Sequence, residues 1–187
     1  MIYPKKLSSK KKDLIFKIFL ISSFIVGLLL VLINKITTPT TPWAALANAG
    51  IIYIWITVFY SIKKNTNIAG HVLIQAIAIS LLTIYIDYEL GFEKWSINIS
   101  VPIIIMIANI TMLILTIVSY KKYIKYAVYQ LIIVIFSMIP VILISENIIQ
   151  NKVLSIVASS ISIINLIITL ILSAKDVKAV IIRKFHI

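Results

Sequence analysis

Residues 97–118 read INISVPIIIMIANITMLILTIV, a run of 22 residues without a charged side chain. At 1.5 Å per residue, a helix of this length spans about 33 Å, enough to cross a hydrocarbon core of about 30 Å. A lone strand could not cross there, because its unpaired backbone groups would face lipid. The run therefore predicts a transmembrane helix, and it indicates that lipid is the solvent for much of the chain.

Further apolar runs of similar length flank this one on both sides. Together they give six expected spans: Leu14–Ile33, Trp43–Ile62, Ile68–Ile86, Ile97–Val118, Ile124–Ile144 and Val153–Leu172. The links between them are too short to hold another domain, so each span should run antiparallel to the next. The expected fold class is an all-α, antiparallel bundle of six transmembrane helices over residues 14–173, preceded by a basic segment at residues 1–13.

The composition of the chain agrees with a membrane protein. Of its 187 residues, 61% are hydrophobic and 13% are charged, whereas a soluble domain is about half apolar and a quarter charged. The net charge is +12, and the charged residues flank the spans. We therefore expect anionic lipid headgroups rather than nucleic acid as the partner. The chain has no cysteine, which excludes disulfides and thiolate chemistry.

The distribution of positive charge predicts an orientation. Of the 18 Lys and Arg residues, three lie in the first, third and fifth links, at Lys35, Lys94 and Lys152. The other fifteen lie at the N-terminus, at the C-terminus and around the second and fourth links. Because positive residues in short loops favour the cytoplasmic side, we expect a multi-pass protein of a bacterial cytoplasmic membrane with both termini in the cytoplasm.

The last residues, 174–187, read as a basic amphipathic tail. Val177, Val180 and Ile181 can face lipid while Lys178 and Arg183 face headgroups, which predicts a C-terminal interfacial helix. A docking segment for a soluble protein is the alternative interpretation.

Uncharged polar residues recur at helical spacing inside the spans. In the fourth span these are Asn98, Asn109 and Thr116. In the sixth span, serines and a threonine recur at the same helical spacing. One interpretation is helix packing, since small residues and amides join helices in lipid. The other is a central pocket for a small polar or amphipathic ligand. The residues that would line such a pocket are Gln75, Asn109, Gln130 and Asn165.

A second candidate site lies in the link between the third and fourth spans. It consists of Asp87, Glu89, Trp95 and Asn98, placed where the carboxylates should reach water. The functional interpretation is an acidic site for a cation or a cationic ligand. The alternative is a solvated loop in which Asp87 caps a helix or pairs with a lysine. Because Asp87 ends a polar helical face, we expect it to point inward and to bond a neighbouring span.

The sequence offers no pattern for catalysis. It contains neither an HExxH zinc motif nor a phosphate-binding loop, and its two histidines, His71 and His186, stand far apart. We therefore expect no catalytic residue, no cofactor and no metal ligand set. The expected role is a non-enzymatic accessory or sensor subunit, in contact with a protein partner or a second copy of itself. A small-solute carrier or substrate-binding component of a transporter is the alternative, and an intramembrane enzyme is the third.

Several short pieces along nearly the whole chain show a resemblance to known proteins. They are Tyr3-Pro4, Gly50-x-x-Tyr53-x-Trp55, Asp87 with Gly91, Trp95-Ser96-x-Asn98 with Pro102, Asn109, Tyr126 with Tyr129, Ile139-Pro140 and Arg183-Lys184-Phe185-His186. In this order they resemble an uncharacterised family of six-span membrane proteins of the Firmicutes. Members of that family often begin with a cysteine zinc ribbon, which this cysteine-free chain lacks. The resemblance implies a fold but no reaction.

A weaker similarity is architectural. Six spans with basic inner loops are similar to the substrate-binding subunits of energy-coupling-factor vitamin transporters. Those subunits dock their partner through an alanine-rich motif on the first helix, where this chain offers Ser23-x-x-x-Gly27. Likeness of fold does not give function.

The orientation can be tested with reporter fusions. A reporter that is active only in the cytoplasm should be active when fused after Ile187 and silent when fused after Lys94, because the charge bias places these points on opposite sides. A silent fusion at the C-terminus, or an active one after Lys94, would show that the orientation is wrong.

Overall fold

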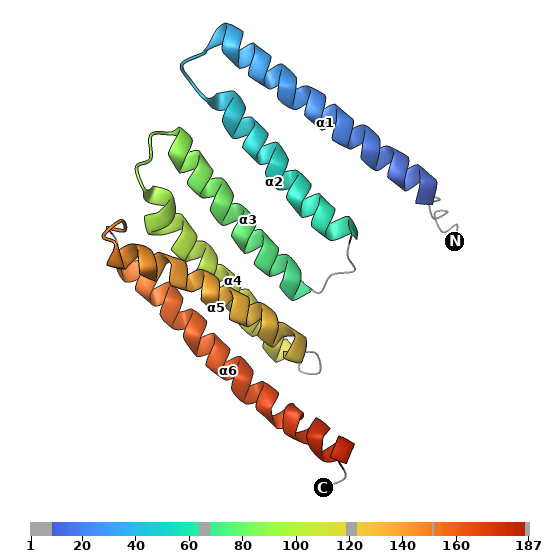
Figure 1. Ribbon diagram of the computed structural model, residues 1–187, viewed down its shortest axis with the longest axis vertical. Helices are drawn as coiled ribbons and strands as arrows, with labels where there is room; N and C mark the ends of the chain where they lie inside the picture. The colour runs from blue at the N-terminus through green and yellow to red at the C-terminus, as the bar shows by residue number, and fades with distance from the viewer. Residues whose placement is uncertain (1–8, 64–67, 119–122, 151, 186–187) are drawn as a thin grey trace. The chain divides into compact units, whose positions relative to one another are not determined.

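Six α-helices make up most of the computed structural model, which describes residues 9–63, 68–118, 123–150 and 152–185 (Figure 1). They are α1 (Ser9–Thr37), α2 (Trp43–Lys63), α3 (Ile68–Glu89), α4 (Val101–Val118), α5 (Tyr123–Ser145) and α6 (Lys152–Phe185), with a π-helical segment η1 (Ser96–Ser100) before α4. All six are long and apolar enough to cross a membrane. The all-α prediction with six spans is confirmed. Residues 1–8 of the predicted basic segment lie outside the described residues.

Most helix boundaries differ from the predicted ones by a few residues, and three of the differences are informative. The first span was expected to end at Ile33, but α1 continues to Thr37, two residues before Pro39. The helix ends there because the residue before a proline disfavours the helical conformation. The fourth span begins with the π-helical turn η1, which a hydropathy pattern cannot signal. The predicted tail helix continues α6 without a break as far as Phe185. The side chains of this tail lie outside the described part, so its amphipathic character stays a prediction.

Contacts divide the chain into two compact units, Met1–Ile54 and Trp55–Ile187. In the first unit, Asn34 joins the end of α1 to the start of α2. Its Nδ2 donates to the carbonyls of Thr38 at 2.6 Å and Thr41 at 2.9 Å, and its Oδ1 accepts from the amide of Ala44 at 3.0 Å. The side chain therefore satisfies backbone groups that a turn between two helices leaves unpaired.

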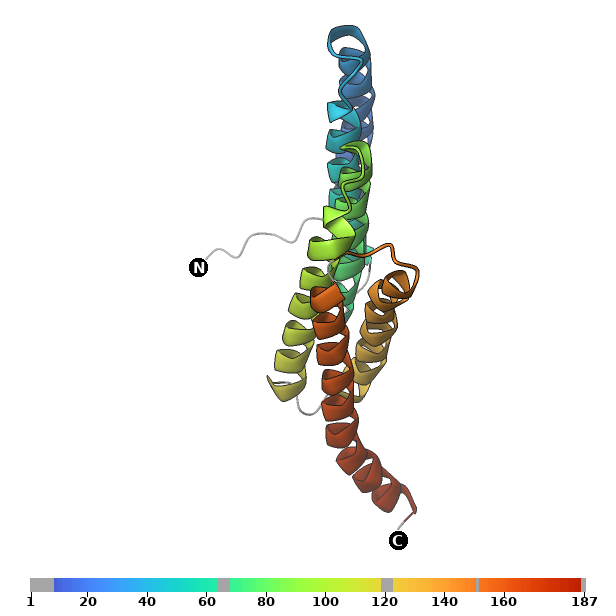
Figure 2. The same cartoon turned by 90° about the vertical axis from the view of Figure 1, so that its left-hand side faces the viewer.

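The second unit contains an antiparallel bundle of α3, α4, α5 and α6 (Figure 1). Helix α6 packs against both α4 and α5 (Figure 2). Helices α4 and α5 also contact each other. Helix α3 packs against α4, η1 and α5. The resulting core is narrow and contains small residues, among them Ala69, Ala76 and Ala108, together with Met112 and Ile133.

Helix α6 shows that the protein has its polar side chains inside and its apolar ones outside. Every buried residue on its described part is small or polar: Ser155, Ala158, Ser159, Ser162, Asn165 and Thr169. The exposed side chains on the same helix include Ile156, Ile163, Ile167 and Ile171. A surface of this kind is suited to lipid, where isoleucine gains nothing from burial and polar groups need protein partners.

Proline 140 leaves one backbone carbonyl of α5 without its helical hydrogen bond. It lies inside the helix, and its missing N–H leaves the carbonyl of residue 136 without its helical donor. At the next residue, Ser159 of α6 donates to the carbonyl of Ser137 at 2.7 Å. A serine on α6 therefore bonds the backbone of α5 within one turn of the proline.

Two helix ends in the second unit close with the same backbone motif. At the end of α3, the amide of Phe92 donates to the carbonyl of Asp87 at 2.8 Å, the amide of Gly91 donates to Tyr88, and Gly91 has φ 104°. At the end of α5, Ile148 donates to Leu143 and Asn147 to Ile144, and Asn147 has φ 56°. These are Schellman caps, which place glycine or asparagine in the left-handed region.

Exchange of serine for leucine on α6 tests the inside-out arrangement. Ser162→Leu should destabilise the protein by about 2 kcal/mol or more, because it overfills a small-residue contact and removes a buried hydroxyl. Ser160→Leu, two residues away on the exposed side, should leave stability unchanged. Reversible unfolding in mixed micelles measures both. Equal losses in the two variants would contradict the assigned helix face.

Candidate functional site

Asparagine 109 of α4 is the centre of a buried network of amides and hydroxyls. Its Nδ2 donates to Ser162 Oγ at 2.6 Å and to the carbonyl of Ile105 at 2.9 Å. Its Oδ1 accepts from Gln130 Nε2 at 2.8 Å, and its backbone carbonyl accepts from Asn165 Nδ2 at 2.8 Å. One residue of α4 is thereby bonded once to α5 and twice to α6.

These contacts place three of the four predicted pocket residues together. Asn109, Gln130 and Asn165 are 0%, 1% and 3% exposed. Asn109 bonds each of the other two directly, so no ligand fits between Asn109 and these partners. Two acceptors nevertheless have no partner: Gln130 Oε1 and Asn165 Oδ1 are buried without a hydrogen bond. A buried carbonyl oxygen without a donor costs about 1–3 kcal/mol, so these atoms indicate where a donor is missing.

Gln75, the fourth predicted pocket residue, belongs to a different contact. It lies half-buried on α3, and its Nε2 donates to Thr57 Oγ1 of α2 at 2.9 Å. A pocket lined by all four residues stays a prediction, and the hydrogen bonds bring only three of the four together. Spacing along α3 could show that Gln75 is near an inner face, but it could not show which neighbouring helix that face meets.

Asp87 is the best-defined residue of the second candidate site. It was expected to reach water, but it is 0% exposed, because the α3–α4 link folds back over the end of α3. Its Oδ2 accepts from the hydroxyl of Ser96 at 2.6 Å and from the amide of Ser96 at 3.1 Å. The expectation that Asp87 points inward and bonds the next span is confirmed. Its other oxygen, Oδ1, is buried without a partner.

The remaining members of the predicted acidic site do not share these bonds. Asn98 donates to the carbonyl of Lys94 at 2.7 Å and accepts from the amide of Gln150 at 2.8 Å, so it joins η1 to the α5–α6 link. The carboxylate of Glu89 accepts a hydrogen bond from Tyr85 on its own helix. Trp95 is half-buried and lies just before η1, and its side chain does not cap that helix with a hydrogen bond.

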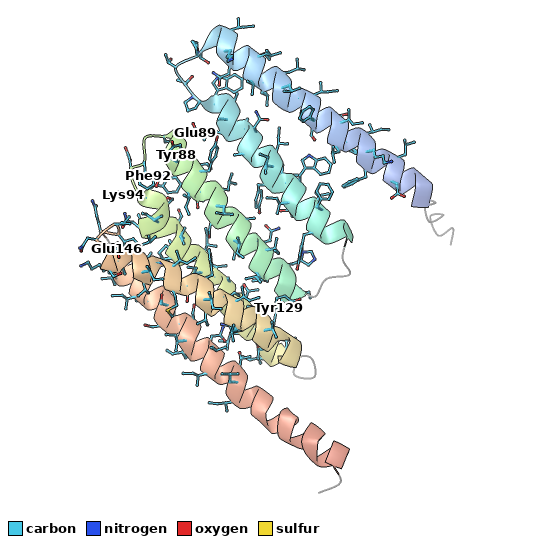
Figure 3. The ribbon with its side chains drawn as sticks, in the orientation of Figure 1. Tyr88, Glu89, Phe92, Lys94, Tyr129 and Glu146 are labelled. Carbon is cyan, nitrogen blue, oxygen red and sulfur yellow. The ribbon has the colours of Figure 1, made fainter. Side chains whose placement is uncertain are left out.

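Carboxylates gather at one end of the second unit, which we call the acidic end. It carries Asp87, Glu89, Glu93 and Glu146, four of the six acids of the chain, beside Lys94 and Lys152. Figure 3 shows Glu89, Lys94 and Glu146 at this end, with Tyr129 toward the other. The field at the acidic end therefore favours cations.

Two residues of these sites were missed by sequence reasoning. Ser96 was placed in a loop, and its role depends on the turn that brings it under Asp87. Ser162 was assigned to the polar face of the sixth span, but its bond to Asn109 joins residues that are 53 positions apart. In both cases the residue type and the helical face were visible, whereas the partner was not.

Comparison with known proteins gives one family. A family model described as a family of unknown function (DUF6320) matches residues 3–187. No curated protein and no solved structure matches the chain.

A double-mutant cycle tests the Asn109 network. Asn109→Leu should cost about 2–3 kcal/mol, because it leaves Gln130 Nε2 without its acceptor and Ser162 Oγ without its donor. Gln130→Leu should cost less, since it also removes an oxygen that already lacks a donor. The coupling between the two should be about 0.6–2 kcal/mol. Thr111→Val, which removes a hydroxyl bonded only within α4, is the control. Additive losses would show that the bond contributes nothing.

Proposed function

Because the chain belongs to the DUF6320 family, whose function is unknown, we propose its role from its own geometry: a non-enzymatic accessory or sensor subunit of a bacterial cytoplasmic membrane. The proposal includes both termini on the cytoplasmic side. It also includes contact with anionic lipid headgroups there, and with a protein partner or a second copy of the chain within the membrane.

The observation that carries this proposal is the way the core uses its polar groups. Asn109 joins α4 with α5 and α6 through one amide hydrogen, its side-chain oxygen and its backbone carbonyl. The polar atoms at the centre of the bundle are amides and hydroxyls that bond each other, as expected for groups that hold helices together. A core of this kind holds the helices rigidly together. The links between the helices and the ends of the chain can then contact a partner protein.

The charge pattern supports the proposed orientation. The acidic end of the second unit carries two lysines, and the α3–α4 and α5–α6 links belong to that end. The second and fourth links carry Lys63, Lys64, Lys121 and Lys122 in the sequence. Since lysines in short loops remain on the cytoplasmic side, the acidic end would face outward.

A small-solute carrier component is the second candidate, and one observation favours it. Gln130 Oε1 and Asn165 Oδ1 are buried acceptors without donors, at the centre of a bundle where ligand sites of membrane proteins commonly occur. A solute with N–H or O–H groups would supply what these atoms lack. Such a solute would bind beside the network rather than between its members.

Purified protein in lipid nanodiscs separates the two candidates from each other and from an enzyme. We expect the low-molecular-weight fraction of a bacterial extract to leave its melting temperature unchanged, because Asn109 is already fully bonded. We also expect an added lipid extract to be recovered chemically unaltered. Crosslinking in intact cells should yield a discrete complex larger than the chain itself.

Other outcomes would change the assignment. A saturable rise in melting temperature that Gln130→Leu abolishes and Thr111→Val retains would favour the carrier. Turnover of a lipid or a peptide by wild-type protein would favour an enzyme. Recovery of the single chain alone after crosslinking would contradict the subunit proposal.

A further inference from the structure

Two tyrosines meet at Gly70, at the end of the second unit opposite the acidic end. Tyr60 lies on the part of α2 that belongs to this unit, Gly70 on α3 and Tyr129 on α5. A β-carbon added to Gly70 would stand 2.6 Å from Tyr60 Oη and 3.4 Å from Tyr129 Cζ, so these two atoms are at most 6.0 Å apart. The glycine lets both rings approach α3 closely.

A histidine joins the two tyrosines. His71 follows Gly70 in the first turn of α3, and its ring contacts that of Tyr60, with the ring centroids 5.0 Å apart and the planes at 86°. All three rings are half-buried, so part of each is accessible from outside the bundle. We call Tyr60, His71 and Tyr129 the tyrosine–histidine cluster. Two phenol hydroxyls and an imidazole give it hydrogen-bond donors from three different helices.

The cluster lies at the depth of a membrane interface. Tyr60 ends the apolar span Trp43–Tyr60, and Tyr129 is the second residue of the span Val128–Ser145. Figure 3 shows Tyr129 away from the acidic end. Side chains with an apolar ring and a polar tip are typical of the headgroup layer. The polar tips of the cluster are therefore placed where lipid headgroups are the nearest ligands.

The charges near the cluster favour an anion. Lys63 follows Tyr60 by one turn on α2, and Lys125 precedes Tyr129 by one turn on α5, so each lysine is nearer the end of its helix. Four of the six acids of the chain lie at the opposite, acidic end. The first turn of α3, which holds His71, adds the positive end of a helix dipole.

We propose that the tyrosine–histidine cluster binds the phosphate group of an anionic phospholipid, with Tyr60 and Tyr129 donating to its oxygens and Lys63 and Lys125 adding positive charge. A phosphate has several charged oxygens that accept strong hydrogen bonds, so two neighbouring hydroxyls can share one group. Basic sites between transmembrane helices on the cytoplasmic side bind headgroups of this kind. The inference rests on the proposed contact with anionic headgroups and assigns that contact to named residues.

Thermal unfolding of the full chain in a non-ionic detergent, with added phosphatidylglycerol, tests the site. We expect the melting temperature to rise by several degrees and to saturate, as for a ligand that binds only the folded state. Tyr60→Phe combined with Tyr129→Phe should weaken binding about tenfold or more, because two charge-assisted hydrogen bonds are lost. Tyr88→Phe, which removes an exposed hydroxyl at the acidic end, should bind like wild type. These variants keep every charge, so a general attraction to lysines would affect them equally.

Wild-type protein decides the question if the double variant does not fold. Native mass spectrometry should retain bound phosphatidylglycerol. Diacylglycerol with the same acyl chains, which lacks the phosphate, should leave the melting temperature unchanged, and so should inorganic phosphate alone. A rise with inorganic phosphate alone would assign the cluster to a soluble anion and overturn the lipid. An equal rise with diacylglycerol, or equal binding by a folded double variant, would overturn the phosphate site.

These outcomes are distinct from those of the proposed function. Reporter fusions and crosslinking test the orientation and the partner protein in cells, whereas lipid binding in detergent depends on neither. Failure of lipid binding would leave the subunit proposal in place, and a monomeric chain in cells would leave the lipid site in place.

Discussion

The structure depends on one constraint, which is that a polar group inside a membrane must find its partner within the protein. No water is present in the hydrocarbon core to replace a missing bond. Asn109 meets this constraint by bonding Ser162, Gln130 and Asn165 from two other helices. The isoleucines of α6 can face outward because lipid accepts them, and the serines of the same helix must face inward because lipid does not.

The same constraint explains why the ends of the helices are tied so closely. At the acidic end, Asp87 closes α3 through its backbone carbonyl and joins η1 through its carboxylate. Asn98 then connects η1 to the α5–α6 link through Gln150. Polar side chains therefore bring together the two links at this end, which lie more than 50 residues apart in the sequence. The π-helical turn is part of this arrangement, as such turns frequently are at functional sites.

Unpartnered atoms are informative against this background. Most buried polar side chains in a native protein have a hydrogen-bond partner. Five atoms among the described residues stand out because they have none: Ser80 Oγ, Asp87 Oδ1, Gln130 Oε1, Ser155 Oγ and Asn165 Oδ1. Two of them, the amide oxygens of Gln130 and Asn165, lie in the core beside the Asn109 network and suit a neutral N–H or O–H donor.

The sequence by itself determined the class of fold, because 22 uncharged residues in a row can satisfy their backbone only as a helix in lipid. It also determined which face of the fourth and sixth spans is buried: the helical spacing of Asn98, Asn109 and Thr116, and of the serines of α6, follows the buried side. The pairing of these faces was decided only by the tertiary structure. Gln75 and Gln130 are alike in type and in spacing, yet one bonds Thr57 and the other Asn109. Ser96 became the partner of Asp87 only when the link folded over the end of α3. A helical period fixes a direction around one axis, whereas a hydrogen bond between helices depends on how two axes lie relative to each other.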